Sequence, residues 1–325
     1  NTFMHVTRDL YGDQIWIPAV QDSARTFMVY IDEVQAGTHK PNADITIDGT
    51  RIEINGLLGV MEMNGILCKV IFDRNNYRHD FFVEESQVIE WMFPYLTPHG
   101  LIMKLNREPT TFQDDGETAI NDLDFWDWYT RRLHGNPKFL RDIAARKSFS
   151  KLRTSIGGVY AFQRQFANAE RAFREAAILY PISADAVFRL VRRTLLPQDR
   201  FDEGLWQLEE FAKRDPGNRD VPQYVGYIGQ FRQLRDMIRK LEQNRKDGTV
   251  DAATELQLAD LYRQAQEPET MMMHINTLMN ISNLPAQLSY RAASVLQKER
   301  KFPDMDRALQ RCLQTLPEDT PPHIY

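Results

Sequence analysis

Residues 151–181, KLRTSIGGVYAFQRQFANAERAFREAAILYP, decide the fold of the second half of this chain. Six residues in this stretch have the spacing of two packed helices closed by a proline: Gly157, Tyr160, Ala169, Phe173, Ala176 and Pro181. The small residues let the two helices approach closely, and the aromatic rings fill the space between them. Arg153 stands where such a repeat carries a large aromatic residue near its start.

This spacing is typical of the tetratricopeptide repeat, which has a period of about 34 residues. The separation between Pro181 and Pro317 is four times that period, and Pro216 closes an intermediate repeat one position late. The last two repeats match at this spacing: Ala259 with Ala293, Tyr262 with Leu296, Met271 with Met305, and Ile275 with Leu309. The repeat at 221–246 is degenerate. We therefore expect about five stacked helical pairs, with a further degenerate pair at 122–148 left open.

The N-terminal part of the chain, 1–110, is predicted to form a small α/β domain with at least some parallel strand pairing. The expected elements are helices at 22–34 and 60–73, a hairpin at 45–54 around Gly49, and strands at 81–83 and 101–105. Between these strands, Pro94 and Pro98 exclude a continuous helix. The predicted fold class is thus α/β plus all-α, with an α/β domain at 1–110, linker and junction helices at 111–149, and a tetratricopeptide superhelix at 150–325. Within the middle part, 110–119 is the predicted linker.

Composition restricts the classes of function. The chain has 325 residues, 40 basic and 45 acidic, for a net charge of −5, which argues against a nucleic-acid surface. Cys68 and Cys312 make neither a disulfide framework nor a zinc site. No apolar run approaches the roughly 20 residues of a membrane span, and the chain begins without methionine or a signal peptide. We expect a soluble region of a longer protein.

No catalytic set, cofactor or metal site is predicted. The chain has no phosphate-binding glycine loop, and its seven histidines include no pair at helical ligand spacing. Glu84 and Glu85 are adjacent on a strand and point to opposite faces, which favours a solvated strand end. His99 lies in a turn where a structural role is favoured. An alternative hypothesis, an enzyme, would gather His5, Asp9, Glu84 and His99 in one deep pocket.

Two further features carry open alternatives. Trp126 and Trp128 could form a sugar-stacking platform, although core packing where the two halves join is the favoured interpretation. A tetratricopeptide array also offers peptides a concave groove lined by first helices, and one variant grips a C-terminal carboxylate with paired lysine and asparagine. The comparable positions here are Thr154 and Gly158, Leu256 and Asp260, and Tyr290 and Ser294. That clamp is absent, so the groove's ligand stays unspecified.

Three strings carry a resemblance to a known family: DLYGDQIWIPAVQDSARTF at 9–27, HDFFVEESQVIEWMFPYLTPHGLIMKLNREP at 79–109, and FSKLRTSIGGVYAFQRQFANAERAFREA at 149–176. Over residues 1 to about 215, the chain resembles bacterial multi-spanning membrane proteins that look related to protein O-mannosyltransferases. The resemblance implies transmembrane helices, then a mixed α/β region and tetratricopeptide repeats. The carboxylates expected to act in such transferases lie in the membrane part, so none transfers to this chain.

From these observations we predict a non-catalytic region of a membrane glycosyltransferase-like protein, at the periplasmic face of the inner membrane. Its repeats would bind or position a protein partner or acceptor, without nucleic acid, and it would meet the membrane only through a missing N-terminal region. A free-standing tetratricopeptide scaffold is the alternative. The sequence leaves the oligomeric state unknown.

Overall fold

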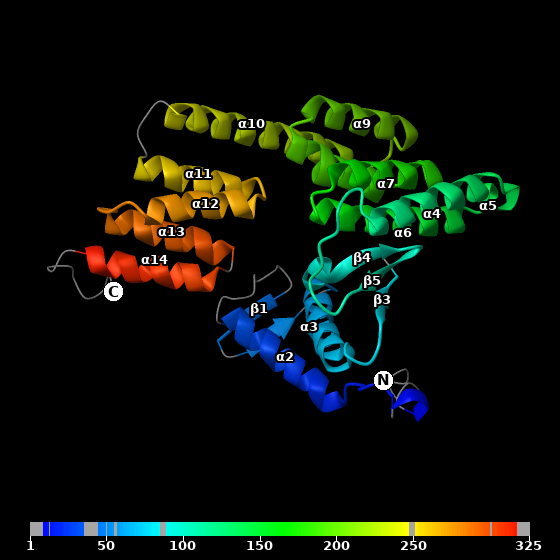
Figure 1. Cartoon of the computed structure of the whole chain (residues 1–325), viewed down its shortest axis with the longest axis horizontal. Helices are drawn as coiled ribbons and strands as arrows, with labels where there is room; N and C mark the ends of the chain where they lie inside the picture. Colours follow the sequence, from blue (N-terminus) through cyan, green and yellow to red (C-terminus); the bar gives the residue numbers. More distant parts are fainter. Residues whose placement is uncertain are drawn as a thin grey trace. The chain divides into compact units, whose positions relative to one another are not determined.

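The computed structural model forms two compact units, residues 1–194 and 195–325, which are described one at a time (Figure 1). The structure describes residues 9–12, 14–35, 45–49, 51–54, 57–84, 89–246, 251–299 and 301–316. The division between the units falls within a π-helical turn, Val191–Leu195. It therefore lies inside the predicted repeat array and not at the predicted boundaries near 110 and 149.

Among the described residues between 20 and 75, the first unit has two helices and a hairpin. Helices α2, Val20–Gln35, and α3, Leu57–Asn75, pack on each other, with Tyr30 and Ile31 against Met63 and Ile66. Strands β1, Ile45–Asp48, and β2, Arg51–Ile54, are antiparallel and joined through Gly49, whose φ of 59° a glycine adopts without steric cost. The predicted helices and the hairpin are confirmed.

A three-stranded sheet follows, and all its pairing is antiparallel. Its strands β3, Phe81–Val83, β4, Leu96–His99, and β5, Ile102–Leu105, lie in the order β3-β5-β4. The predicted parallel pairing is wrong, because parallel neighbours need a crossover of a dozen or more residues and β4 turns into β5 at Gly100. Strand β4 was not predicted. Its Pro98 is tolerated because β4 is an edge strand, where a missing N–H breaks no ladder.

Aromatic side chains and neighbouring helices hold this sheet in place. On α3, the ring of Phe72 lies 5.5 Å from that of Phe81 on β3, and 5.6 and 5.7 Å from those of Trp91 and Tyr95 in a 3₁₀ helix, Glu90–Tyr95. Helices α4, Glu117–His134, and α6, Ile143–Phe162, contact β4. The sheet is thus packed between α3 and the first helices of the all-α region.

Between α4 and α6 the chain breaks where glycine and proline predict it. Gly135 ends α4, the Asn136 side chain accepts the N–H of Lys138 at 3.0 Å, and Pro137 opens the short helix α5, Pro137–Arg141. Helices α7, Phe166–Leu179, and α8, Ala184–Leu190, complete the first unit. The predicted break is confirmed.

The predicted linker at 110–119 is instead bound to the first repeat. The Gln163 amide donates to the carbonyl of Thr110 at 2.9 Å, Gln165 donates to Phe112, and Asn168 donates to Asp114 at 3.0 Å. From Glu117 onward the segment is the first turns of α4. These contacts make it an integral part of the first unit.

The second unit is helical throughout its described residues. It contains a 3₁₀ turn, Leu196–Gln198, and six helices: α9 Phe201–Arg214, α10 Val221–Lys246, α11 Ala252–Gln264, α12 Pro268–Met279, α13 Ala286–Lys298 and α14 Phe302–Thr315. Helix α10 is continuous over 26 residues, so the degenerate repeat predicted at 221–246 is one helix and not a helical pair. The tightly packed consecutive pairs are α6/α7, α11/α12 and α13/α14. None of the described helices is both long enough and apolar enough to cross a bilayer.

Four turns of one geometry mark the repeats. In each, a backbone N–H bonds to the carbonyl five positions earlier: Gln165 to Tyr160 (2.9 Å), Arg200 to Leu195 (3.0 Å), Glu267 to Tyr262 (2.9 Å) and Lys301 to Leu296 (3.0 Å). This is the Schellman ending of a helix, and Arg164, Asp199 and Gln266 adopt its left-handed position. The second turn follows the first by one repeat period, to within one position. The third follows the second by two periods, again to within one position, with α10 between them, and the fourth follows the third by one period. Tyr262 and Leu296 are thus equivalent, as predicted, whereas Pro317 lies outside the described residues.

Candidate functional site

The signature residues of the first repeat form the interface of α6 and α7. Tyr160, Ala169, Phe173 and Ala176 are fully buried, and Pro181 is half-buried just after α7. A Cβ added to Gly157 would lie 2.8 Å from the Phe173 ring, closer than such contacts occur in proteins. Glycine therefore sets the distance between the two helices.

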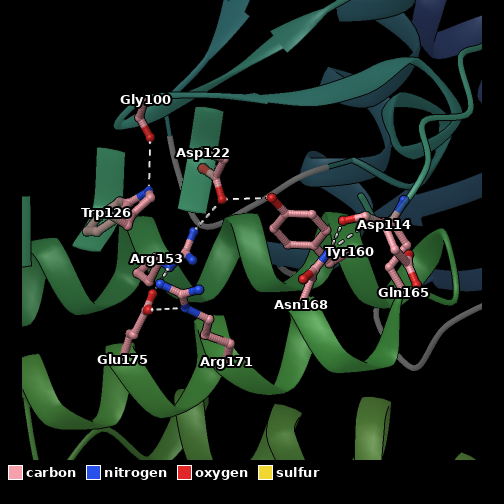
Figure 2. Close-up of polar contacts among 10 residues, drawn as sticks. All are labelled: Gly100, Asp114, Asp122, Trp126, Arg153, Tyr160, Gln165, Asn168, Arg171 and Glu175. Carbon is pink, nitrogen blue, oxygen red and sulfur yellow. Dashed lines mark hydrogen bonds and ion pairs between the residues drawn. The ribbon is translucent and has the colours of Figure 1, made fainter. Parts of the chain in front are cut away.

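Arg153, at the position expected for an aromatic residue, is fully buried in a charged cluster (Figure 2). Its guanidinium donates to Asp122 on α4 at 2.8 Å and to Glu175 on α7 at 2.7 Å. The Tyr160 hydroxyl donates to the same Asp122 oxygen at 2.8 Å. The guanidinium also lies 5.0 Å from the ring of Trp126. One side chain thus joins three helices.

Burial governs the electrostatics of this cluster. It raises the pKa of Asp122, against the opposing effect of Arg153 and Tyr160, and it raises the pKa of Tyr160, which also faces the Asp122 carboxylate. One oxygen of Asp122 and one terminal nitrogen of Arg153 are buried and have no hydrogen-bond partner among the described residues. Because the members from α4 and α6 are shut off from solvent, the cluster can hold helices together but cannot reach a substrate.

A second charged cluster occupies the same repeat position three periods later. Residue 255, three periods after Arg153, is Glu255, which is also fully buried. It accepts from Arg245 of α10 at 2.7 Å and lies 2.8 Å from the His274 ring on α12. Tyr262, three periods after Tyr160, donates to Glu242 of α10 at 3.2 Å. Its ring stacks on His274 at 5.2 Å.

Burial and the nearby Glu242 carboxylate raise the pKa of Tyr262 to about 12. In both clusters, the first helix of a repeat is therefore fixed to an earlier helix, α4 or α10, by a buried charge and a tyrosine hydroxyl. Sequence reasoning missed both clusters. The sequence feature that could have indicated them is a charged residue at the position where the repeat carries an aromatic residue, which is Arg153 in one repeat and Glu255 in another.

The structure does not assemble the hypothetical enzyme site. Asp9, Glu84 and His99 are exposed, and among the described residues no hydrogen bond or ion pair joins any two of them. The His99 ring lies 5.1 Å from that of Phe82 at the sheet surface. His5 and Glu85 lie outside the described residues. No group of three or more His, Cys, Asp or Glu side chains within the described ranges is arranged to hold a metal ion.

The two tryptophans of α4 differ in environment. Trp126 is fully buried, and its indole N–H donates to the carbonyl of Gly100 at 3.1 Å, which ties α4 to the β4–β5 turn. Trp128 is 55% exposed, beside Tyr129 at 5.8 Å and below the Arg132 guanidinium at 5.6 Å. Because their side chains lie in different environments, they do not form one stacking surface.

At the first repeat, the predicted groove positions are covered by the chain itself. Thr154 is buried, and the ring of Phe93, from the 3₁₀ helix before β4, stacks on Phe162 of α6 at 5.3 Å. A Cβ at Gly158 would lie 3.9 Å from Phe93 and 3.6 Å from Arg189 of α8. This end of the first helix is therefore not available to a partner.

Between α11 and α13 the corresponding face is open. A cavity of about 290 Å³ lies between these two first helices, lined by Leu256, Gln257, Asp260, Leu261, Arg291, Ser294, Val295 and Lys298. It includes three of the predicted groove residues, whereas the fourth of that region, Tyr290, is 59% exposed and does not line it. Asp260 is held by Arg263 and Gln264, each at 2.9 Å. Arg291 and Lys298 are exposed, and neither forms an ion pair with a described residue.

Comparisons with known proteins add little to this geometry. No family model and no curated protein matches the chain. Among solved structures, a chain described as the crystal structure of MamA is 14% identical over 49% of this chain and 94% of its own length, with a TM-score of 0.23. A tetratricopeptide repeat protein from Parabacteroides merdae is 9% identical over 61% and 80%, with a TM-score of 0.26. Scores this low carry no argument, so the repeat assignment rests on the turns and packing above.

Proposed function

We propose that this chain binds a protein partner through the face formed by α11 and α13. The observation that carries the proposal is the cavity between these first helices, which combines apolar side chains, polar groups and two cations that form no ion pair with a described residue. A binding site usually consists of an apolar recess with a small number of polar groups that point into it. In this proposal the repeats form a superhelical array and the chain itself has no catalytic role.

A photo-crosslinking amino acid placed at two positions of α13 tests partner binding. Ser294 lines the cavity, whereas Gln297, on the same helix, is exposed and does not line it. With the full chain expressed in its own cells, we expect a protein adduct from position 294 and none from position 297. Equal adducts at both positions, or none at either, would overturn the proposal.

We further propose that the chain is the extracytoplasmic region of a membrane glycosyltransferase-like protein, at the periplasmic face of the inner membrane. The support is the resemblance of residues 1 to about 215 to that family. The partner would then be an acceptor protein or another component of the transferase. A free-standing scaffold remains the competing proposal, supported by the same cavity.

An immunoblot of fractionated source cells, with antibody against this chain, separates the two proposals. A band much larger than 38.0 kDa in the membrane fraction supports the glycosyltransferase context. A soluble band near 38.0 kDa refutes that context and leaves the free-standing scaffold.

A further inference from the structure

Two cations of α13 give the cavity between α11 and α13 a chemical preference. Arg291 and Lys298 are separated by two helical turns, so both lie on the side of α13 that lines the cavity. Asp260, whose carboxylate lines the cavity, already accepts hydrogen bonds from Arg263 and Gln264. Within a chain whose net charge is −5, the recess thus has two cations without an ion-pair partner among the described residues, and one carboxylate that is already hydrogen-bonded. Its charge complements an acidic ligand.

We propose that this cavity binds an internal acidic segment of a partner protein, in extended conformation, with one carboxylate on Arg291 and another on Lys298. The inference rests on the proposed partner-binding function and adds the class of ligand. Two turns of helix span about 10.5 Å at 1.5 Å per residue. Two acidic residues three apart in a polyproline-like segment lie about 9 Å from each other on one side of the segment. The long, flexible basic side chains accommodate the remaining difference.

The other groups that line the cavity fit the main chain of a bound peptide that runs from Arg291 to Lys298. The exposed Gln257 amide and the Ser294 hydroxyl, on opposite walls, can donate to and accept from peptide groups. Leu256, Leu261 and Val295 provide an apolar floor for the intervening side chains. The cations are two turns apart and do not converge on one point, which favours two side-chain carboxylates over a single C-terminal carboxylate.

Fluorescence anisotropy with a defined peptide and the full chain tests this inference. The probe is a labelled, proline-containing peptide with two glutamates three positions apart and an amidated C-terminus. Its controls are the same peptide with glutamines, and a peptide whose only carboxylate is at its C-terminus. We expect the glutamate probe to bind, and binding to weaken as salt screens the charges.

Matched variants locate the binding. Arg291→Gln with Lys298→Gln should weaken binding of the probe roughly tenfold or more, since each charge-assisted contact is lost. Arg214→Gln with Lys240→Gln removes the same charge at exposed positions of α9 and α10 that do not line the cavity, and should change binding less than twofold. Circular dichroism melts should show that both variants fold as the unaltered chain does.

The alternative outcomes each overturn the inference in a distinct way. Equal binding of the glutamine peptide removes the charge requirement, and equal loss in both double variants assigns binding to overall charge. Binding of only the peptide with a free C-terminus replaces the internal segment by a terminal carboxylate. If no acidic peptide binds while position 294 still crosslinks to a protein, the inference about the ligand fails and the proposed scaffold function stands.

Discussion

Replacing Arg153 by methionine tests whether the buried cluster holds the first unit together. The change keeps an apolar chain of similar length but leaves the Asp122 carboxylate buried with only the Tyr160 hydroxyl as a partner. Breaking a buried ion pair on one side typically costs about 3 to 5 kcal/mol, because the remaining charge is uncompensated. Glu175 contributes less to this cost, since it is 16% exposed and also accepts from Arg171 at 2.9 Å. We therefore expect Arg153→Met to lower the free energy of unfolding by about 3 to 4 kcal/mol.

Urea denaturation followed by tryptophan fluorescence measures this loss in the full chain. Four of the five tryptophans, Trp16, Trp91, Trp126 and Trp128, lie in the first unit, so their emission reports its unfolding. A Trp206→Phe background removes the signal of the second unit. The first unit's transition is fitted by itself, because two units need not unfold together.

A double-mutant cycle with Asp122→Asn decides between charge coupling and loss of packing. If the pair is coupled, the double variant should be more stable than the sum of the two single losses predicts, by about 2 kcal/mol. Asparagine can still accept from Tyr160, so the cycle isolates the Arg153–Asp122 contact. A loss below about 1 kcal/mol for Arg153→Met, or strictly additive losses, would refute the reasoning.

The remaining predictions concern close packing, turns and pH. Gly157→Ala should lower the free energy of unfolding by about 1 to 2 kcal/mol, because the added Cβ would collide with Phe173. Gly229→Ala, where a Cβ meets nothing within 4 Å, should raise it by about 1 kcal/mol, and urea unfolding measures both changes. Gln266→Gly should raise the melting temperature, because glycine adopts the φ of 61° without the roughly 1 kcal/mol strain of other residues. Tyr262 has a pKa raised from 10.0 to about 12, so its stabilisation is complete below pH 10 and lost between pH 10 and 12. Ultraviolet titration should find this tyrosine protonated when an exposed one has ionised; normal ionisation in the native chain would contradict the burial argument.

Local pattern was sufficient for elements whose signals lie within one helix or turn. The repeat period, the break at Gly135 and Pro137, and the hairpin at Gly49 all follow from short-range steric rules. Prediction failed where the deciding partner is distant in sequence. The single helix α10 places its buried Arg235 between Asp199 and Glu267, on two separate turns that are far from it in the sequence. Strand β4 was missed for a different reason: it pairs with the adjacent β5, but its Pro98 is typical of a strand breaker and is tolerated because β4 is an edge strand.

The candidate site shows the same limit. The sequence predicted that Leu256, Asp260 and Ser294 belong to a groove, because their repeat positions face the concave side. It could not show that the equivalent face at Thr154 and Gly158 is covered by Phe93, since that contact joins segments far apart in the sequence.

By itself, the sequence determined that this chain builds helical repeats, because the spacing of small, aromatic and turn-forming residues acts over a few helical turns. Only the tertiary structure decided which charges are buried and which are free. Arg153 and Glu255 meet charged partners on other helices and serve stability, while Arg291 and Lys298 line the recess between α11 and α13. The sequence shows only that each of these residues is charged, and its role depends on which groups the fold brings within about 4 Å of it.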